Sequence, residues 1–249
     1  MLLRVLCGEK IMKEKTIGIL GGMGPEATVD CHARIIQNTP AKTDQQHLRV
    51  VIDSNPKVPD RTAAITGKGP SPVPTLVSGC CALQAAGADF IIMPCVSAHF
   101  YLTEIRRQIT LPILSIYDAV ADSISVNYPD INTVGLMGTS GTISGGLFQK
   151  RLTAANCKTI VPDDTRQAKV MAAIYDIKNS ASPRSRKQIT SDLVAVALSL
   201  LSDGAQGIIA GCTEIPLALN QQHLSVPYFD ALTILARAAI IEAGRTPVP

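Results

Sequence analysis

Short apolar runs recur along the first half of the chain, separated by longer stretches with helical character. The three runs are Lys15–Leu20, Leu48–Ile52 and Asp89–Met93. A Gly-rich turn, Gly21–Pro25, follows the first run, and its proline suits the first position of a helix. A stretch with helical character, 74–86, precedes the third run. Strands that alternate with helices are typical of parallel βαβ units, so the pattern predicts an α/β fold.

The same pattern occurs twice along the chain. Two pairs of segments realign at one offset of 117 residues: 16–24 with 133–141, and 87–95 with 204–212. The second pair ends in Cys95 and Cys212, and an apolar run marked by proline follows each cysteine, at 111–115 and 226–230. We therefore predict two α/β halves related by duplication. Each half presents a Gly-rich turn and a cysteine at the carboxyl ends of its strands, where open α/β sheets bind ligands.

Composition and charge narrow the possible functions. The 249 residues include 23 Lys and Arg against 20 Asp and Glu, and no basic run marks a nucleic-acid surface. No apolar stretch reaches the roughly 18 residues of a membrane helix, and residues 1–8 lack the apolar region of a secretion signal. We therefore expect a cytoplasmic protein that binds neither nucleic acid nor membrane. Residues 1–11 are expected to be a tail or to precede the native start.

Cys95 and Cys212 are the candidates for reactive sulfur among the seven cysteines. Each precedes a segment with helical character, and the positive end of a helix dipole stabilises a thiolate. The other five are expected to fill the core: Cys7, Cys31, Cys80, Cys81 and Cys157. Two isolated cysteines offer too few ligands for a closed zinc site, and a cytoplasmic location disfavours a disulfide.

Pseudo-twofold packing of the two halves would place Cys95 and Cys212 across one cleft. Two opposed thiols suit two-base proton transfer, because one thiolate removes a proton and the other thiol delivers one to the opposite face. That chemistry inverts a stereocentre.

Six motifs then carry a family resemblance. They are GGMGPEAT (21–28), PDRT (59–62), MPCVSAH (93–99), GTSGT (138–142), IYDIK (174–178) and GCTE (211–214). In order and spacing they resemble the cofactor-independent aspartate/glutamate racemase family of the Asp/Glu/hydantoin racemase superfamily. The resemblance spans about residues 15–240. It implies a PLP-independent amino-acid racemase without cofactor or metal, with Cys95 and Cys212 as its two acid/base residues.

The resemblance also implies an architecture. It predicts an α/β protein with two pseudo-symmetric three-layer domains, mainly parallel sheets, an active site in the cleft between the domains, and a homodimer. Because the chain crosses back in such families, residues 12–114 and 226–249 are expected to form the first domain. Residues 115–225 are expected to form the second.

Substrate contacts follow from the motifs. Arg61 resembles the family's carboxylate-binding arginine, and Lys178 resembles a lysine that contacts a substrate carboxylate. Ser97, Thr139 and Thr213 resemble the donors that hold the α-carboxylate and stabilise the charge that develops at Cα. Without the motifs, Arg61 and Lys178 would be interpreted as solvated surface charges.

Three further positions belong to the predicted site. Met23 and Glu214 lie within two of the motifs, and Glu214 could orient a cysteine or the substrate ammonium, as could His99. A polar hydrogen bond in the core is an equal alternative for Glu214 and His99. The complete set predicted to bind the substrate is Met23, Arg61, Val96, Ser97, Thr139, Lys178, Thr213 and Glu214.

Val96 departs from the family motif, which normally reads Pro-Cys-Asn-Thr-Ala-His. Ser97 can replace the threonine hydroxyl, but Val96 supplies neither the donor nor the acceptor of asparagine. A ligand carboxylate that loses a partner costs about 1–3 kcal/mol. The alternatives to aspartate or glutamate are therefore a less acidic or bulkier amino acid, or a hydantoin.

Two other classes of protein compete with a racemase. Gly22–Ala27 fits the G-x-G-x-x-A pattern of a dinucleotide-binding oxidoreductase, and Asp53 ends the next strand, but the second half does not preserve that pattern. A binding protein that keeps the scaffold without turnover is the second alternative, which Val96 leaves open.

Overall fold

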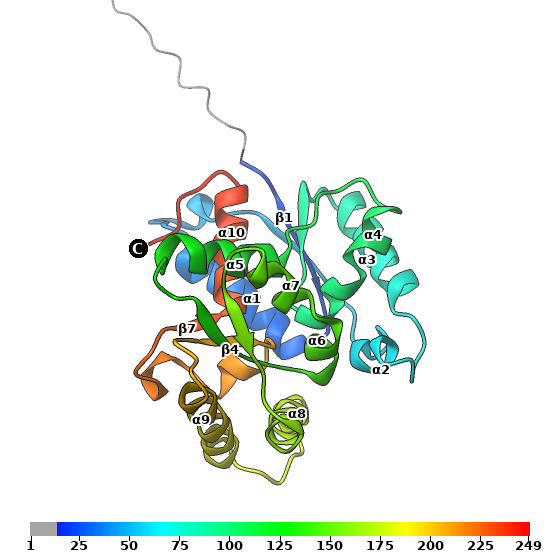
Figure 1. Ribbon diagram of the computed structural model, residues 1–249. Helices are drawn as coiled ribbons and strands as arrows, with labels where there is room; N and C mark the ends of the chain where they lie inside the picture. Colours follow the sequence, from blue (N-terminus) through cyan, green and yellow to red (C-terminus); the bar gives the residue numbers. More distant parts are fainter. Residues whose placement is uncertain (1–13) are drawn as a thin grey trace, which may run out of the picture.

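The computed structural model describes residues 14–249 and contains two parallel β-sheets (Figure 1). The first sheet has the order β2-β1-β3 and the second the order β5-β4-β6-β7. Their strands are β1 (Ile17–Gly21), β2 (Val50–Ser54), β3 (Phe90–Ile92), β4 (Thr133–Gly138), β5 (Lys158–Ile160), β6 (Ile208–Gly211) and β7 (Tyr228–Asp230). All paired strands run parallel, which confirms the predicted α/β class. The predictions for residues 1–11 and Cys7 lie outside the described residues.

Helices cover both faces of each sheet. Those of the first half are α1 (Pro25–Asn38), α2 (Arg61–Ile65), α3 (Val73–Ala85), α4 (Leu102–Arg106) and α5 (Ile116–Asn127). Those of the second half are α6 (Ser140–Gly145), α7 (Leu147–Thr153), α8 (Asp164–Lys178), α9 (Arg186–Ser202) and α10 (Ala231–Glu242). Pro25 occupies the first turn of α1, as expected from the sequence. Within residues 14–249, none of the helices has the length and apolar character to cross a membrane.

The repeat in the sequence corresponds to a repeat in topology. β1 and β3 are neighbours in the first sheet, and β4 and β6 are neighbours in the second. A Gly-containing turn follows β1 and β4, whereas Cys95 and Cys212 follow β3 and β6. Each half therefore presents a turn and a cysteine side by side at the carboxyl edge of its sheet, as the duplication predicts.

The predicted position of the last strand was wrong. β7 pairs with β6, through Ile208↔Tyr228, and so belongs to the second sheet rather than to the first domain. The corresponding run of the first half, at 111–115, contacts β3 through the bridge Ile91↔Ile113. In each half this run extends its own sheet beside the cysteine-bearing strand. Only the last helix crosses back, because α10 packs against α1 and α5. The remaining domain boundaries stay a prediction.

An apolar layer shared by the two sheets holds the halves together. It combines buried residues of both sheets with residues of α1, α5, α7 and α10, among them Ile19, Phe90, Leu136, Phe148 and Leu235. Separate clusters lie under α3 and α4 on one flank and under α8 and α9 on the other, which Figure 1 shows at opposite ends of the molecule. The halves are thus joined by buried apolar contacts, which resist any change in their relative position.

The cysteines outside the two strand ends mostly pack in the core. Cys31, Cys80 and Cys157 are buried, but Cys81 is exposed, so the prediction for Cys81 was wrong. Cys80 and Cys81 are neighbours on α3, and successive helical residues point about 100° apart. One therefore faces the sheet and the other faces solvent. All six described cysteines are free thiols.

The turn after β1 depends on a residue without a side chain. Gly22 has φ 87°, and a Cβ there would lie 2.3 Å from the backbone carbon of Asn55. Its N–H donates to the Thr28 hydroxyl at 2.8 Å, which ties the turn to α1. The turn must therefore pass close to the loop after β2, and only glycine permits this approach.

Substitution of Gly22 tests this packing. Gly67 has a similar φ of 73° but open space around its Cα, so Gly67→Ala should cost only the conformational penalty of about 1–2 kcal/mol. Gly22→Ala should lower the free energy of unfolding by clearly more, because backbone atoms must also move. Urea unfolding of both variants measures the difference, and equal losses would contradict the close approach.

Candidate active site

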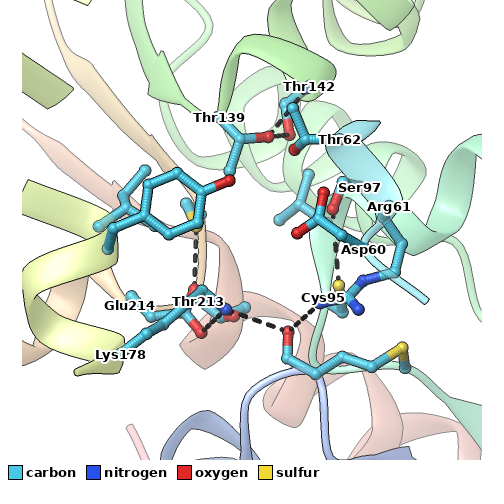
Figure 2. A pocket seen from close by; sticks show the side chains of 15 residues that line it. Asp60, Arg61, Thr62, Cys95, Ser97, Thr139, Thr142, Lys178, Thr213 and Glu214 are labelled. Carbon is cyan, nitrogen blue, oxygen red and sulfur yellow. Dashed lines mark hydrogen bonds and ion pairs between the residues drawn. The ribbon is translucent and has the colours of Figure 1, made fainter. Parts of the chain in front are cut away.

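One pocket at the carboxyl edges of the two sheets collects the predicted site residues. Figure 2 shows Arg61, Cys95 and Ser97 on one side and Lys178, Thr213 and Glu214 on the other. All ten predicted residues line it: Met23, Arg61, Cys95, Val96, Ser97, Thr139, Lys178, Cys212, Thr213 and Glu214. The empty space within this lining is about 380 Å³, including the part open to solvent. The duplication thus brings residues of both halves into one cavity.

Ends of strands and helices position these side chains. Cys95 precedes the 3₁₀ helix Val96–Tyr101, and Cys212 directly follows β6. Arg61 begins α2 and Lys178 ends α8. Thr139 caps α6, since its hydroxyl accepts the N–H of Thr142 at 3.1 Å. Although they come from separate elements, these side chains line one pocket.

Cys212, Glu214 and Lys178 form a series of hydrogen-bonded side chains. Its thiol donates to Glu214 Oε2 at 2.9 Å, and Glu214 Oε1 accepts Lys178 Nζ at 2.7 Å. Burial, and next the charge of Glu214, hold the pKa of the Cys212 thiol well above its usual value. Burial alone lowers the pKa of Lys178, but the charges of Glu214, Cys212 and Cys95 outweigh it and raise that pKa. At neutral pH Cys212 is therefore a thiol whose proton points at a carboxylate.

Cys95 has a cation rather than a carboxylate beside it. Arg61 donates to the carbonyl oxygens of Val58 at 3.1 Å, Pro59 at 2.9 Å and Met23 at 3.1 Å. Its buried Nε has no hydrogen-bond partner in the described part of the chain. Burial lowers the pKa of Arg61, but its interactions with Cys95, Asp60 and Glu214 outweigh burial and raise that pKa. The Arg61 guanidinium therefore lies beside Cys95, whose sulfur is 3.6 Å from the Ser97 hydroxyl oxygen.

Two of the predicted hydroxyl donors are engaged within the protein. Thr213 Oγ1 donates to the Pro94 carbonyl at 3.1 Å, a contact between the two halves. Thr139 Oγ1 lies 3.1 Å from Thr142 Oγ1 in addition to capping α6. Thr213 can therefore accept, but not donate, a further hydrogen bond, whereas the Ser97 hydroxyl lies next to Cys95 and can turn toward a ligand. The sequence could not show these orientations.

The pocket also contains residues that the sequence interpretation missed. Asp60, Thr62, Thr142, Ile174 and Tyr175 line it as well. Asp60 lies in the Pro-Asp-Arg motif and caps α2 by accepting the Ala63 N–H at 2.7 Å. Tyr175 lies three residues before Lys178 on α8, and helical residues three apart share a face. This spacing from Lys178 could have indicated from the sequence that Tyr175 faces the pocket. In the described residues, no group of three or more His, Cys, Asp or Glu is arranged to hold a metal ion.

Comparison with known proteins gives the family. The sequence profile described as Asp/Glu/Hydantoin racemase matches residues 20–239. The chain belongs to this family. This membership confirms the predicted family and the predicted enzyme class, a racemase rather than an oxidoreductase.

Individual relatives agree with the family assignment. The broad specificity amino-acid racemase RacX of Bacillus subtilis (strain 168) is 27% identical over 230 residues, which are 90% of this chain and 96% of RacX. The aspartate racemase of Picrophilus torridus superposes with a TM-score of 0.82 and 29% identity, covering 94% of this chain and 96% of that one. An aspartate racemase homologue from Pyrococcus horikoshii OT3 gives 0.71 and 27%, covering 94% and 100%.

Removal of the Glu214 charge should change the reactivity of Cys212. Glu214→Gln removes a charge that disfavours the thiolate and leaves Lys178 unpaired beside the sulfur. Because the thiolate is the nucleophile, iodoacetamide should alkylate Cys212 faster at pH 7.5 than in the unaltered protein. Peptide mass spectrometry measures the rate. Glu104→Gln, at an exposed position of α4, is the matched control and should leave the rate unchanged. A slower or unchanged rate in Glu214→Gln would contradict the charge assignment.

Proposed function

We propose that this racemase acts on amino acids without PLP, by proton transfer between Cys95 and Cys212 on opposite faces of Cα. The observation that carries the proposal is the unequal setting of the two thiols in one pocket. Cys95 lies beside the Arg61 guanidinium, whereas Cys212 donates to Glu214 at 2.9 Å. The proposal assigns Cys212, which donates to a carboxylate, as the acid and Cys95, which lies beside a cation, as the base.

One turnover removes one proton from Cα and returns one proton to it. The Cys95 thiolate removes the α-proton and becomes a thiol, and the electron pair left on Cα delocalises into the α-carboxylate. The Cys212 thiol then delivers its proton to the other face of Cα and becomes a thiolate. The positive charge of Lys178, which is held near Cys212 by its ion pair with Glu214, stabilises this thiolate. The opposite enantiomer reacts by the reverse sequence. The Ser97 hydroxyl, which can turn toward a ligand carboxylate, would stabilise the intermediate charge.

The proposed substrate is aspartate or glutamate. Two cations, Arg61 and Lys178, line the pocket, and two of the similar structures are named as an aspartate racemase and its homologue. Two carboxylates, Asp60 and Glu214, balance these cations, and Val96 offers no polar side chain. These observations favour, as the second candidate, a racemase of non-acidic amino acids or a hydantoin, and RacX is itself named a broad-specificity enzyme. We further propose that the protein is a homodimer, as the family resemblance implies, and that it is cytoplasmic, as its sequence leads us to expect.

Proton exchange with solvent tests the reaction. In D₂O without added PLP, the protein should incorporate deuterium at Cα of an amino acid and racemise it. Cys95→Ala and Cys212→Ala should each lower the racemisation rate by at least about 10²–10⁴-fold, because neither thiol can serve the other face. NMR and chiral chromatography over a panel of both enantiomers measure exchange and racemisation.

The exposed Cys81 provides the matched control. Cys81→Ala should keep full activity, which excludes a general effect of thiol removal. Full activity in either Cys95→Ala or Cys212→Ala would overturn the two-base assignment. A complete absence of exchange with all amino acids would overturn the proposed substrate class.

Val96→Asn tests the role of the altered motif. If the missing asparagine tunes specificity, this variant should raise kcat/KM for aspartate by about tenfold, since one recovered hydrogen bond is worth about 1–1.5 kcal/mol. Circular dichroism over the substrate panel measures the change. Leu102→Asn, which introduces the same amide outside the lining of the pocket, should not raise it. An unchanged preference in Val96→Asn would show that this position does not select the substrate.

A further inference from the structure

Two buried aromatic side chains lie behind the Cys95 loop, outside the lining of the pocket. His99 and Tyr117 are 1% and 6% exposed. His99 Nδ1 lies 2.9 Å from the Cys95 carbonyl oxygen, and the Tyr117 hydroxyl donates to the Val96 carbonyl oxygen at 3.0 Å. Two consecutive carbonyls of the loop are therefore held by side chains from the core.

These contacts also fix the direction of two N–H groups. In a trans peptide the carbonyl and the N–H of the same unit point in opposite directions. The N–H groups opposite the two held carbonyls belong to Val96 and Ser97, both of which line the pocket. Among the hydrogen bonds of residues 14–249, neither N–H has an acceptor. Carbonyls held in the core thus leave these two donors free for a ligand.

The two aromatic residues are themselves braced. The His99 and Tyr117 rings meet edge to face at 5.8 Å, and the Tyr117 ring meets Phe148 of α7 in the same way at 4.6 Å. His99 Nε2 lies 3.3 Å from the Leu114 carbonyl oxygen. Burial lowers the pKa of His99 to about 4, so the ring is neutral at physiological pH and has one N–H. The shorter contact indicates that this N–H is on Nδ1 and donates to the Cys95 carbonyl.

We propose that His99 and Tyr117 are positioning residues of the racemase reaction, which hold the Cys95 and Val96 peptide units so that the thiol and both N–H groups keep their aim into the pocket. The inference rests on the proposed function. It matters in this chain because position 96 has no polar side chain, so the backbone N–H is the donor that remains there.

Variants of His99 separate positioning from packing. Asparagine places an amide nitrogen near the position of Nδ1, whereas the longer glutamine places it near Nε2. His99→Asn should therefore keep kcat within about threefold, and His99→Gln should lower kcat by about 10- to 100-fold with a smaller change in KM, since small misplacements of reacting groups cost this much. Tyr117→Phe keeps the ring contact with Phe148 but loses the hydroxyl, and should lower kcat by about tenfold.

Matched controls and a second readout complete the test. His32→Gln on α1 and Tyr128→Phe, which lies beside Phe229, should leave kcat unchanged. The rate of Cys95 alkylation by iodoacetamide at pH 7.5, relative to that of the exposed Cys81, should fall in His99→Gln and Tyr117→Phe but not in His99→Asn. A role in stability alone would lower Tm without this split between asparagine and glutamine.

The outcomes separate the two proposals. Equal kcat and equal Cys95 alkylation in the unaltered protein, His99→Gln and Tyr117→Phe would overturn the positioning role. If the unaltered protein exchanges no α-proton of any amino acid, the proposed function fails, and the Cys95 alkylation rates then decide the positioning role alone.

Discussion

A single carbonyl oxygen, that of Met23, is shared by the two cations of the pocket. It accepts Arg61 Nη2 at 3.1 Å and Lys178 Nζ at 3.3 Å. Arg61 comes from the first half and Lys178 from the second, so this acceptor joins the halves at a point where their charges would repel. Because both cations converge on Met23, one remains beside Cys95 and the other beside Glu214. The turn that carries Met23 therefore helps to place both cations at the pocket.

Packing between the two halves keeps the pocket residues in fixed positions. The apolar layer between the sheets, the crossing of α10 onto α1 and α5, and the Thr213 hydrogen bond to Pro94 all fix the relative position of the two carboxyl edges. Catalysis by preoriented groups requires such rigidity, because a donor that must move first loses most of its benefit. The buried Phe148 links this layer to Tyr117, and through it to the Cys95 loop.

The sequence predicted the strands and the pocket residues better than it predicted strand pairing and side-chain contacts. The repeat placed Cys95 and Cys212 at equivalent strand ends, and the motifs identified ten residues that the structure brings into one pocket. The domain of β7 was predicted wrongly: the family resemblance implied that the chain crosses back before this strand, whereas β7 pairs with β6 and only α10 crosses. The direction of the Thr213 hydroxyl and the buried contacts of His99 depend on atoms far apart in sequence, so no local pattern could reveal them.

The unequal settings of the two thiols have a consequence for the free enzyme. In the proposed reaction each turnover leaves the site with the proton on the other sulfur, so a second turnover in the same direction must wait until that proton returns. Glu214 disfavours the form with a Cys212 thiolate. The two forms of the unliganded enzyme then differ in free energy. Because the equilibrium constant between the enantiomers is one, kcat/KM must be equal for both, so this difference can appear only in kcat and KM taken separately. Recycling of the empty site thereby becomes a kinetic step in its own right.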